Sequence, residues 1–216
     1  MKDVKQHISG SRIDYSKSEL DEKIIDKDPI AEFARWMKEV IDKKFPEPNA
    51  MVLSTVSQEG RPSSRILLLR GFDEKGFVFY TNYHSKKGKD IEQNPHASMN
   101  FFWHDAEKQV RIEGVLEKLS PAESDAYFRT RPRESQLGAW TSQQSESISN
   151  RTELEKKYKE TEEKFKGVDV PRPPHWGGYL LKPDVIEFWQ GRPSRLHDRI
   201  QYTLKNEKWV IERLAP

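Results

Sequence analysis

Residues 50–82, "AMVLSTVSQEGRPSSRILLLRGFDEKGFVFYTN", decide the fold class, because three apolar runs in this stretch are separated by short polar links. The runs cover residues 50–57, 64–72 and 77–82, and they are rich in the β-branched and aromatic residues that suit strands. The links "QEGR" and "DEKG" carry glycine and acidic residues, as hairpin connections do. The stretch therefore predicts neighbouring antiparallel strands.

Further strand patterns follow towards the C-terminus. They are "ASMNFFW" (97–103), "QVRIEGVLEKL" (109–119), "GGYLLKP" (177–183), "VIEFWQG" (185–191), "RIQYTL" (199–204) and "KWVIERL" (208–214). Helical segments are interspersed, but strand and helix do not alternate strictly, and no glycine-rich nucleotide loop occurs. The pattern favours an antiparallel barrel with helical decoration over a doubly wound sheet.

The helices carry their own start signals. Residues 28–45 predict an amphipathic helix, with Asp28 as N-cap and Pro29 at its first position. Ser120 and Glu123 form a capping box for a helix that should end near Arg131. A short helix should follow Ser85. The helix from Asn150 to Gly167 has a thin apolar stripe, so we expect it to lie on the surface.

Residues 1–27 are polar and lack periodicity, so we expect a mobile arm, followed by one domain over residues 28–216. The 37 basic and 35 acidic side chains nearly cancel, at +2, which argues against a general binder of polyanions. The absence of cysteine excludes disulfides and thiolate chemistry and fits a reducing compartment. Without a membrane-length apolar run or a secretory h-region, the sequence predicts a cytoplasmic protein that binds neither membrane nor nucleic acid.

Ser85, Lys86 and Lys87 stand at the start of the predicted helix after "YTNYH". Backbone N–H groups at a helix N-terminus, together with two lysines, can hold a phosphate. The alternative is that these lysines are only solvated. Arg65 and Arg70 flank the apolar run "ILLL"; they should point to opposite faces of a regular strand, and they could equally be its solvated ends.

Tyr127 and Arg131 are i, i+4 neighbours on a predicted helix, and Ser135 follows on the expected loop. A phenol, a guanidinium and a hydroxyl together suit a phosphate monoester. Arg129 and Arg133 are better assigned to solvent.

The segment "EFWQGRPSRLHDRI" (187–200) crowds cations around His197. It could be a solvated hairpin tip. Alternatively, Trp189 offers a flat apolar surface, and Arg195 and Arg199 offer fixed positive charge to an electron-rich ring. Their mutual repulsion would be tolerable if an electron-rich flavin and an anionic substrate lay among them.

Eight motifs, in order, resemble the pyridoxine (pyridoxamine) 5′-phosphate oxidase family. They are "RILLLRGFDEKGFVFYTN", "SKKGKDIEQNP", "QVRIEGVLEKLS", "YFRTRPRESQLGAW", "HWGGYLL", "IEFWQG", "RLHDRI" and "ERLAP". The resemblance implies a mainly β, antiparallel Greek-key split β-barrel that binds FMN at the interface of a homodimer. It also implies oxidation of pyridoxine 5′-phosphate or pyridoxamine 5′-phosphate to pyridoxal 5′-phosphate, with O2 reduced to hydrogen peroxide.

The resemblance also implies roles for single residues. FMN contacts would be Arg65, Ile66, Leu67, Leu68, Tyr80, Thr81, Lys86, Lys87, Gln109, Gln144, Ser145, Trp189 and Arg199. Substrate contacts would be Arg70, Tyr127, Arg131, Ser135, Arg195, Leu196, His197, Arg12 and Tyr15, with Arg195 and His197 catalytic and no metal required. The family commonly has Lys where this chain has Arg70, and Arg where it has Lys86. Charge is kept, but the geometry of the phosphate contacts is altered.

Two other classes of function remain open from the sequence. Another split-barrel flavin oxidoreductase would share the FMN contacts but not the Tyr127, Arg131 and Ser135 group. A noncatalytic carrier of vitamin B6, or a barrel that binds nucleic acid, would also use interleaved aromatic and basic residues.

Overall fold

The computed structural model describes residues 2–10 and 14–216, which form two compact units. Unit 1 consists of the described residues up to 48 together with 101–111 and 185–216, and unit 2 of residues 49–100 and 112–184. Strands β5, β6 and β7 each contribute residues to both units. Arg12 lies outside the described residues, so its predicted role stays a prediction.

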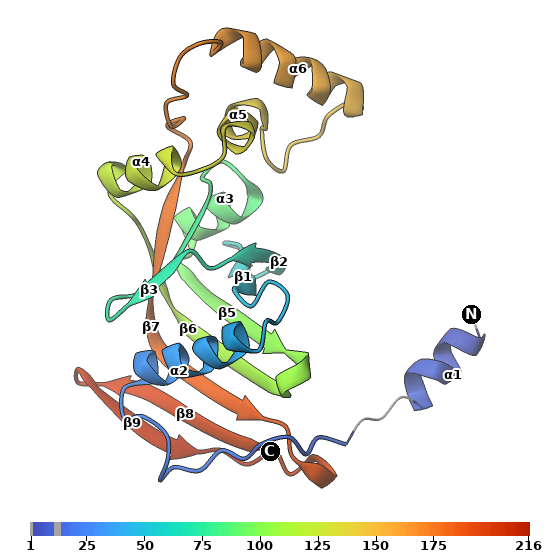
Figure 1. The fold of residues 1–216 in the computed structure, drawn as a ribbon, viewed down its shortest axis with the longest axis vertical. Helices are drawn as coiled ribbons and strands as arrows, with labels where there is room; N and C mark the ends of the chain where they lie inside the picture. The colour runs from blue at the N-terminus through green and yellow to red at the C-terminus, as the bar shows by residue number, and fades with distance from the viewer. Residues whose placement is uncertain (1, 11–13) are drawn as a thin grey trace. The chain divides into compact units, whose positions relative to one another are not determined.

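The elements follow the chain in the order drawn in Figure 1. The α-helices are α1 (Lys2–Gly10), α2 (Pro29–Asp42), α3 (Lys86–Gln93), α4 (Pro121–Arg129), α5 (Arg133–Thr141) and α6 (Arg151–Lys164). Two 3-10 helices are η1 (His104–Ala106) and η2 (Pro193–Arg195). The strands are β1 (Ala50–Val56), β2 (Pro62–Leu68), β3 (Gly71–Asp73), β4 (Gly76–Asn82), β5 (His96–Trp103), β6 (Lys108–Lys118), β7 (Trp176–Gln190), β8 (Asp198–Lys205) and β9 (Lys208–Arg213).

The described strands pair in the order β2-β1-β5-β6-β7-β4-β3, with β8 on β7 and β9 on β8. The pairings of β1 with β2 and β5, of β3 with β4, of β4 with β7, and of β8 with β7 and β9 are antiparallel. The antiparallel, mainly β fold class predicted from the sequence is confirmed.

The second apolar run, residues 64–72, does not form a single strand. Strand β2 ends at Leu68, and the backbone N–H of Arg70 donates to the carbonyl of Val78 on β4. The chain has then left β1 and turned to pair with β4. The condition for Arg65 and Arg70 to point to opposite faces, that both lie on one regular strand, is therefore not met.

The two patterns at residues 177–183 and 185–191 form a single strand, β7. Residues 176–181 pair with β4, and residues 185–190 pair with β8. Pro183 falls between these two ladders, where its missing N–H costs neither of them a hydrogen bond. Proline thus marks the change of partner and not the end of the strand.

The helix predictions are confirmed for α2, α3, α4 and α6, with small differences at their ends. Asp28 caps α2, Ser120 and Glu123 form the capping box of α4, and α6 has no buried residue. Among the described residues, two α-helices and the two 3-10 helices were not predicted. One of these α-helices is α1, inside the expected arm; the other is α5, whose N-cap position is Pro132 and has no side-chain cap.

The core of unit 1 lies between α2 and the strands beside it (Figure 1). Phe33, Trp36, Met37 and Val40 form the buried face of α2. The ring of Trp36 lies 5.1 Å from that of Phe188 on β7. Burial of such rings contributes on the order of 2 kcal/mol each, so this face fixes the helix to the sheet.

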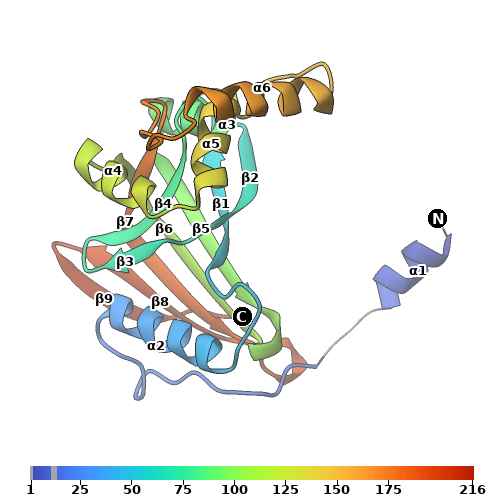
Figure 2. The ribbon, with the colours of Figure 1, turned by 45° about the horizontal axis from the view of Figure 1, so that its top comes forward.

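In unit 2, helices α4 and α5 share a second apolar cluster with the segment after α6. Its buried members are Phe128, Leu137, Ala139, Phe165, Val170 and Trp176. Helix α5 packs against α6 (Figure 2). This cluster holds α4 and α5 next to the start of β7, where several predicted site residues lie. Among the described residues, no helix has the length and apolarity needed to cross a bilayer.

Candidate functional site

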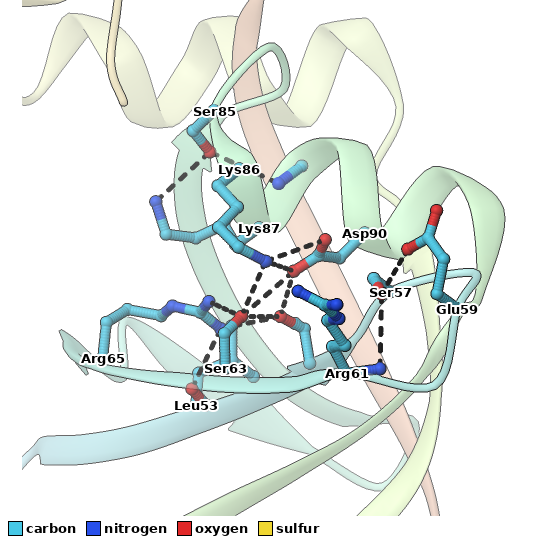
Figure 3. Close-up of polar contacts among 12 residues, drawn as sticks. Leu53, Ser57, Glu59, Arg61, Ser63, Arg65, Ser85, Lys86, Lys87 and Asp90 are labelled. Carbon is cyan, nitrogen blue, oxygen red and sulfur yellow. Dashed lines mark hydrogen bonds and ion pairs between the residues drawn. The ribbon is translucent and has the colours of Figure 1, made fainter. Parts of the chain in front are cut away.

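A cationic cluster surrounds the N-terminus of α3 in unit 2 (Figure 3). Ser85 is the N-cap; its Oγ accepts from the backbone N–H of Gly88 and donates to the carbonyl of Asn82 at 2.7 Å. The side chain of Lys87 is buried, and its Nζ donates to Gln144 Oε1 at 2.7 Å and to Ser85 Oγ at 3.2 Å. Burial, together with the nearby charge of Arg65, lowers the pKa of Lys87 to about 8.

Arg65 is held in the same cluster by neutral oxygens. Its Nη1 donates to the carbonyl of Leu53 and to Thr55 Oγ1, and its Nη2 donates to Ser63 Oγ at 2.6 Å. Within the described part of the chain, neither Arg65 nor Lys87 has an ion pair with a carboxylate. Lys87 is thus a buried cation without an ion pair among the described residues. Arg65 is half-buried and is linked to the Asp90 carboxylate through the hydroxyls of Thr55 and Ser63.

Lys86 differs from these two, because its Nζ lies 3.1 Å from Asp90 Oδ2 (Figure 3). Asp90 also accepts from Thr55 at 2.8 Å and from Ser63 at 3.1 Å. Burial alone would raise the pKa of Asp90, but the hydrogen bonds from Lys86, Thr55 and Ser63 outweigh it and lower the pKa. Asp90 is therefore an ionised carboxylate, and it holds the side chains of Lys86, Thr55 and Ser63 in place.

These contacts fit a phosphate group. The buried Lys87, which has no ion pair among the described residues, lies in the first turn of α3, where N–H groups and the helix dipole both favour an anion. A groove of about 630 Å³ opens beside Lys86, and its lining also includes Gln144, Ser145 and the carboxylates of Glu59, Asp90 and Glu146, but not Arg65 or Lys87. The sequence did not single out Ser63, Thr55 and Asp90, because their role appears only when β1, β2 and α3 come together.

A second cation lies among stacked rings in the same unit. The rings of Tyr80 and Tyr127 are 3.8 Å apart and nearly parallel, and Trp176 stacks on Tyr80 at 5.5 Å. The guanidinium of Arg131 lies 4.5 Å from the centre of the Trp176 ring. Its Nη1 is buried without a hydrogen-bond partner among the described residues.

A buried guanidinium nitrogen without an acceptor is costly, so it points to a ligand that supplies one. Burial lowers the pKa of Arg131; Tyr127 opposes this shift, and the charge of Arg70 adds to it, so Arg70 is part of the same electrostatic environment. Ser135 is not on a loop as expected, because it lies in the first turn of α5. Arg133 is exposed, as expected, and also donates to the carbonyls of Phe165 and Val168.

Unit 1 brings Tyr15, Trp189 and His197 together. The His197 ring lies 4.6 Å from Trp189 and 5.9 Å from Tyr15. Its Nδ1 accepts from the backbone N–H of Arg192 at 3.1 Å, which leaves Nε2 as the protonated nitrogen of a neutral ring. Burial, with the nearby charge of Arg195, lowers the pKa of His197 from its ordinary value.

The cations around His197 are less repulsive than the sequence suggested, because two of them have carboxylate partners. Arg199 donates to both oxygens of Glu187, at 2.8 and 3.0 Å. Arg192 forms an ion pair with Glu19 at 2.8 Å. For Arg199, the Glu187 carboxylate therefore already offsets part of the charge that a flavin and an anionic substrate were expected to make tolerable. A glutamate inside the apolar run "VIEFW" was the sequence signal for Glu187.

Arg195 differs from its neighbours. It is exposed, it has a positive φ of 62°, and it has no ion pair within the described residues. Ser194 before it also has a positive φ, of 58°. Two consecutive non-glycine residues in this region are strained, and such strain is frequent at functional sites.

The remaining predicted residues are distributed over both units. Thr81 is buried and donates to Gln144 Oε1 at 3.3 Å. Ile66 and Leu196 are exposed, at 72% and 68%, while Leu67, Leu68 and Gln109 are half-buried and Ser145 is exposed. The structure thus forms three groups: Arg65, Thr81, Lys86, Lys87 and Gln144; Tyr80, Tyr127 and Arg131; and Tyr15, Trp189 and His197.

Two family models match this chain. A family model described as "Pyridoxamine 5'-phosphate oxidase" matches residues 37–165. A second, described as "Pyridoxine 5'-phosphate oxidase C-terminal dimerisation region", matches residues 176–216. The second match covers Trp189, Arg195, His197 and Arg199.

Curated relatives match almost the whole chain. The pyridoxine/pyridoxamine 5'-phosphate oxidase of Paraburkholderia phymatum is 54% identical over 97% of this chain and 99% of its own length. The protein of the same name from Rubrobacter xylanophilus is 51% identical over 99% of this chain and 98% of its own length.

Solved structures are similar as well. PhzG from Burkholderia lata, solved with tetrahydrophenazine-1-carboxylic acid, has a TM-score of 0.87 and 28% identity, covering 93% of this chain and 100% of that one. A pyridoxamine 5'-phosphate oxidase-related, FMN binding protein from Nostoc punctiforme has a TM-score of 0.69 and 21% identity, over 88% of this chain and 98% of that one. The split β-barrel class expected from the sequence is confirmed.

Proposed function

The chain belongs to the pyridoxamine 5′-phosphate oxidase family, and from this premise we propose that it oxidises pyridoxine 5′-phosphate and pyridoxamine 5′-phosphate to pyridoxal 5′-phosphate. FMN is the proposed cofactor, O2 the electron acceptor and hydrogen peroxide the second product. The proposed assembly is a homodimer with FMN at the interface, supported by the match to a dimerisation region.

The observation that supports the proposal is the presence of two separate cation groups in unit 2, each with one buried cationic side chain or nitrogen that lacks an anionic partner among the described residues. The first is Arg65 with the buried Lys87; the second is Arg131, with its orphaned Nη1. A phosphorylated cofactor and a phosphorylated substrate would each use one of them. We assign the FMN phosphate to the first group and the substrate phosphate to the second, with Arg70, Tyr127 and Ser135 beside Arg131.

FMN, when bound, would accept a hydride from the substrate carbon and pass two electrons to O2. The chain's own residues bind and orient. His197, neutral and fixed through Nδ1, would offer its Nε2–H to the substrate, and Arg195 would bring positive charge to the ring. The alcohol substrate loses a hydride and its hydroxyl proton to become the aldehyde; the amine substrate gives an imine, which water converts to aldehyde and ammonia. We assign no general base.

One alternative has a specific observation behind it. The structure is similar to PhzG, whose bound ligand is a tetrahydrophenazine carboxylic acid and not a phosphate ester. Another split-barrel flavin oxidase would need no orphaned guanidinium for phosphate. The noncatalytic carrier of vitamin B6 remains as a second alternative, and binding without oxygen consumption would favour it.

The test compares phosphorylated and unphosphorylated substrate under air. We expect a yellow protein that releases FMN on denaturation, and formation of pyridoxal 5′-phosphate with a kcat/KM at least about 100-fold above that for pyridoxine, as about 2.7 kcal/mol of phosphate contact predicts. Arg131→Met should remove most of this preference. Equal rates on both substrates, or a preference for a phenazine carboxylate, would contradict the assignment.

A further inference from the structure

Glu107 lies at the point where the N-terminal segment meets the turn before β6, in unit 1. It is 5% exposed, and its backbone is left-handed, with a φ of 53°. Its Oε2 accepts two backbone N–H groups, from Ser16 at 2.8 Å and from Lys17 at 2.9 Å. A buried carboxylate that accepts two main-chain donors is a strong, directional anchor.

The backbone of Glu107 has a second attachment, on the side of the predicted site. Its carbonyl accepts from the backbone N–H of Gly191 at 2.8 Å and from Gln190 Nε2 at 3.1 Å. These residues follow Trp189 and begin the loop that carries His197. One residue thus joins the N-terminal segment to the end of β7.

Tyr15 lies next to both attachments, because it precedes Ser16 in the chain and packs against Gly191. Its ring packs edge-on against Trp189, at 5.7 Å, and against His197, at 5.9 Å. A Cβ on Gly191 would lie 2.7 Å from Tyr15 Cβ, closer than such atoms approach. Only glycine at position 191 lets Tyr15 come this near.

Residues 15–22, here called the strap, are fastened further along by ion pairs. Arg213 binds Glu22 at 2.5 Å and the carbonyl of Leu20 at 2.9 Å. Arg192 reaches Glu19 at 2.8 Å. These contacts hold the far end of the strap. The end next to Tyr15 is held by the two bonds to the buried Glu107 and, at an exposed position, by the bond from Lys17 Nζ to the carbonyl of Asp105.

We propose that Glu107 is a positioning residue, which docks the strap through the amides of Ser16 and Lys17 so that Tyr15 covers Trp189 and His197. The inference rests on the proposed function, because it gives His197 a substrate. Without the carboxylate, the two amides would bond to water and Tyr15 would leave the ring pair more often. Substrate would then be held less tightly, while the chemical step in the closed state would be unchanged.

The experiment uses the FMN-loaded protein with Glu107→Ala, and with Glu107→Gly as a second variant, since glycine accepts the positive φ. Hydrogen exchange of the Ser16 and Lys17 amides should accelerate at least about tenfold. The KM for pyridoxine 5′-phosphate should rise about fivefold, with kcat within about twofold of wild type. Glu107→Gln keeps an acceptor oxygen, so its amide exchange and its KM should both lie close to the wild-type values.

Two controls separate positioning from general damage. Lys17→Gln removes the bond from Lys17 Nζ to the carbonyl of Asp105 but keeps both amides, so its exchange and KM should match wild type. In a Tyr15→Ala background, Glu107→Ala should add nothing to KM, because both changes act through the same contact.

Retained amide protection in both Glu107 variants would overturn the docking. Faster exchange without a change in KM, or a KM effect that adds to that of Tyr15→Ala, would overturn the positioning role. A wild-type protein that oxidises neither phosphorylated substrate would overturn the proposed function instead, and the exchange measurement would still decide whether Glu107 docks the strap.

Discussion

Among the single residues of the candidate site, Lys87 has the least favourable environment for its charge. It is buried beside Arg65, and its pKa falls to about 8, while the unfolded chain would hold its proton up to about pH 10.4. The folded protein without cofactor therefore binds this proton less tightly than the unfolded chain. Its stability should rise as the pH increases from about 8 towards 10. A bound phosphate would stabilise the charged form of Lys87, so the protein with FMN would bind this proton more tightly than the protein without it.

Lys87→Met should raise the melting temperature of the FMN-free protein by roughly 2–4 °C, the shift expected from about 1 kcal/mol in a chain of this size. The same change should weaken FMN binding, because a cation is lost from the proposed phosphate cluster. In the wild type, FMN affinity should fall up to about tenfold per pH unit above pH 8. Thermal melts and fluorescence titrations measure both; a pH-independent affinity would contradict the assignment of Lys87.

Arg195 is the residue whose loss should slow the proposed reaction without affecting the fold. It is exposed and strained, so its replacement should cost little folding stability. Arg195→Ala should lower turnover at least about tenfold, or about 1.4 kcal/mol in the barrier, while FMN stays bound. Steady-state kinetics together with the flavin absorbance check this. Wild-type turnover in the variant would remove Arg195 from the site.

At the scale of elements, the contact between β6 and β7 depends on Gly114. A Cβ at this position would lie 2.0 Å from the carbonyl oxygen of Lys182 and 2.9 Å from Pro183 Cα. Both obstacles are main chain, so the strands would have to separate. The close approach of β6 to β7 at Lys182 and Pro183 therefore requires glycine at position 114.

Gly114→Ala should destabilise the protein by about 2–3 kcal/mol, the usual range for an overpacked position. Gly138→Ala is the matched control, because Gly138 lies inside α5 and a Cβ there would meet nothing within 4 Å. It should stabilise by up to about 1 kcal/mol, as alanine favours helix. Urea denaturation of the two variants should therefore shift in opposite directions, and shifts of the same sign would refute the packing argument.

Prediction of the elements from sequence succeeded where the signal was local. The capping residues Asp28, Ser120 and Asn150 each bond the backbone of the helix that follows, and this chemistry needs only neighbouring residues. Helix α5 was missed, because Pro132 offers no side-chain cap and Arg133 is fixed by carbonyls more than thirty residues away. Its helical state depends on packing against α6 and the segment after it.

At the scale of the whole molecule, the predicted site residues are divided between the two units. Arg65, Lys87 and Arg131 lie in unit 2, while Trp189 and His197 lie in unit 1 and within the matched dimerisation region. The proposed homodimer, with FMN at its interface, ties flavin binding to assembly. Binding of the cofactor and association of protomers should then favour each other.

Dilution of the FMN-loaded protein should release flavin in step with dissociation into monomers. Light scattering on a size-exclusion column and recovery of flavin fluorescence, followed over the same concentration range, measure the two processes. Coincident transitions are expected. Monomers that retain flavin at full occupancy would show that the proposed interface site is wrong.

The sequence by itself determined what depends on near neighbours: the strand runs, the helix caps, and the motifs that identify the family. The tertiary structure alone decided the charge balance of the site. Glu187 neutralises Arg199, Asp90 holds Lys86, and Arg131 is left with a buried nitrogen that lacks an acceptor among the residues the structure describes. Electrostatic energy depends on distance and burial, which residues far apart in the chain acquire only on folding.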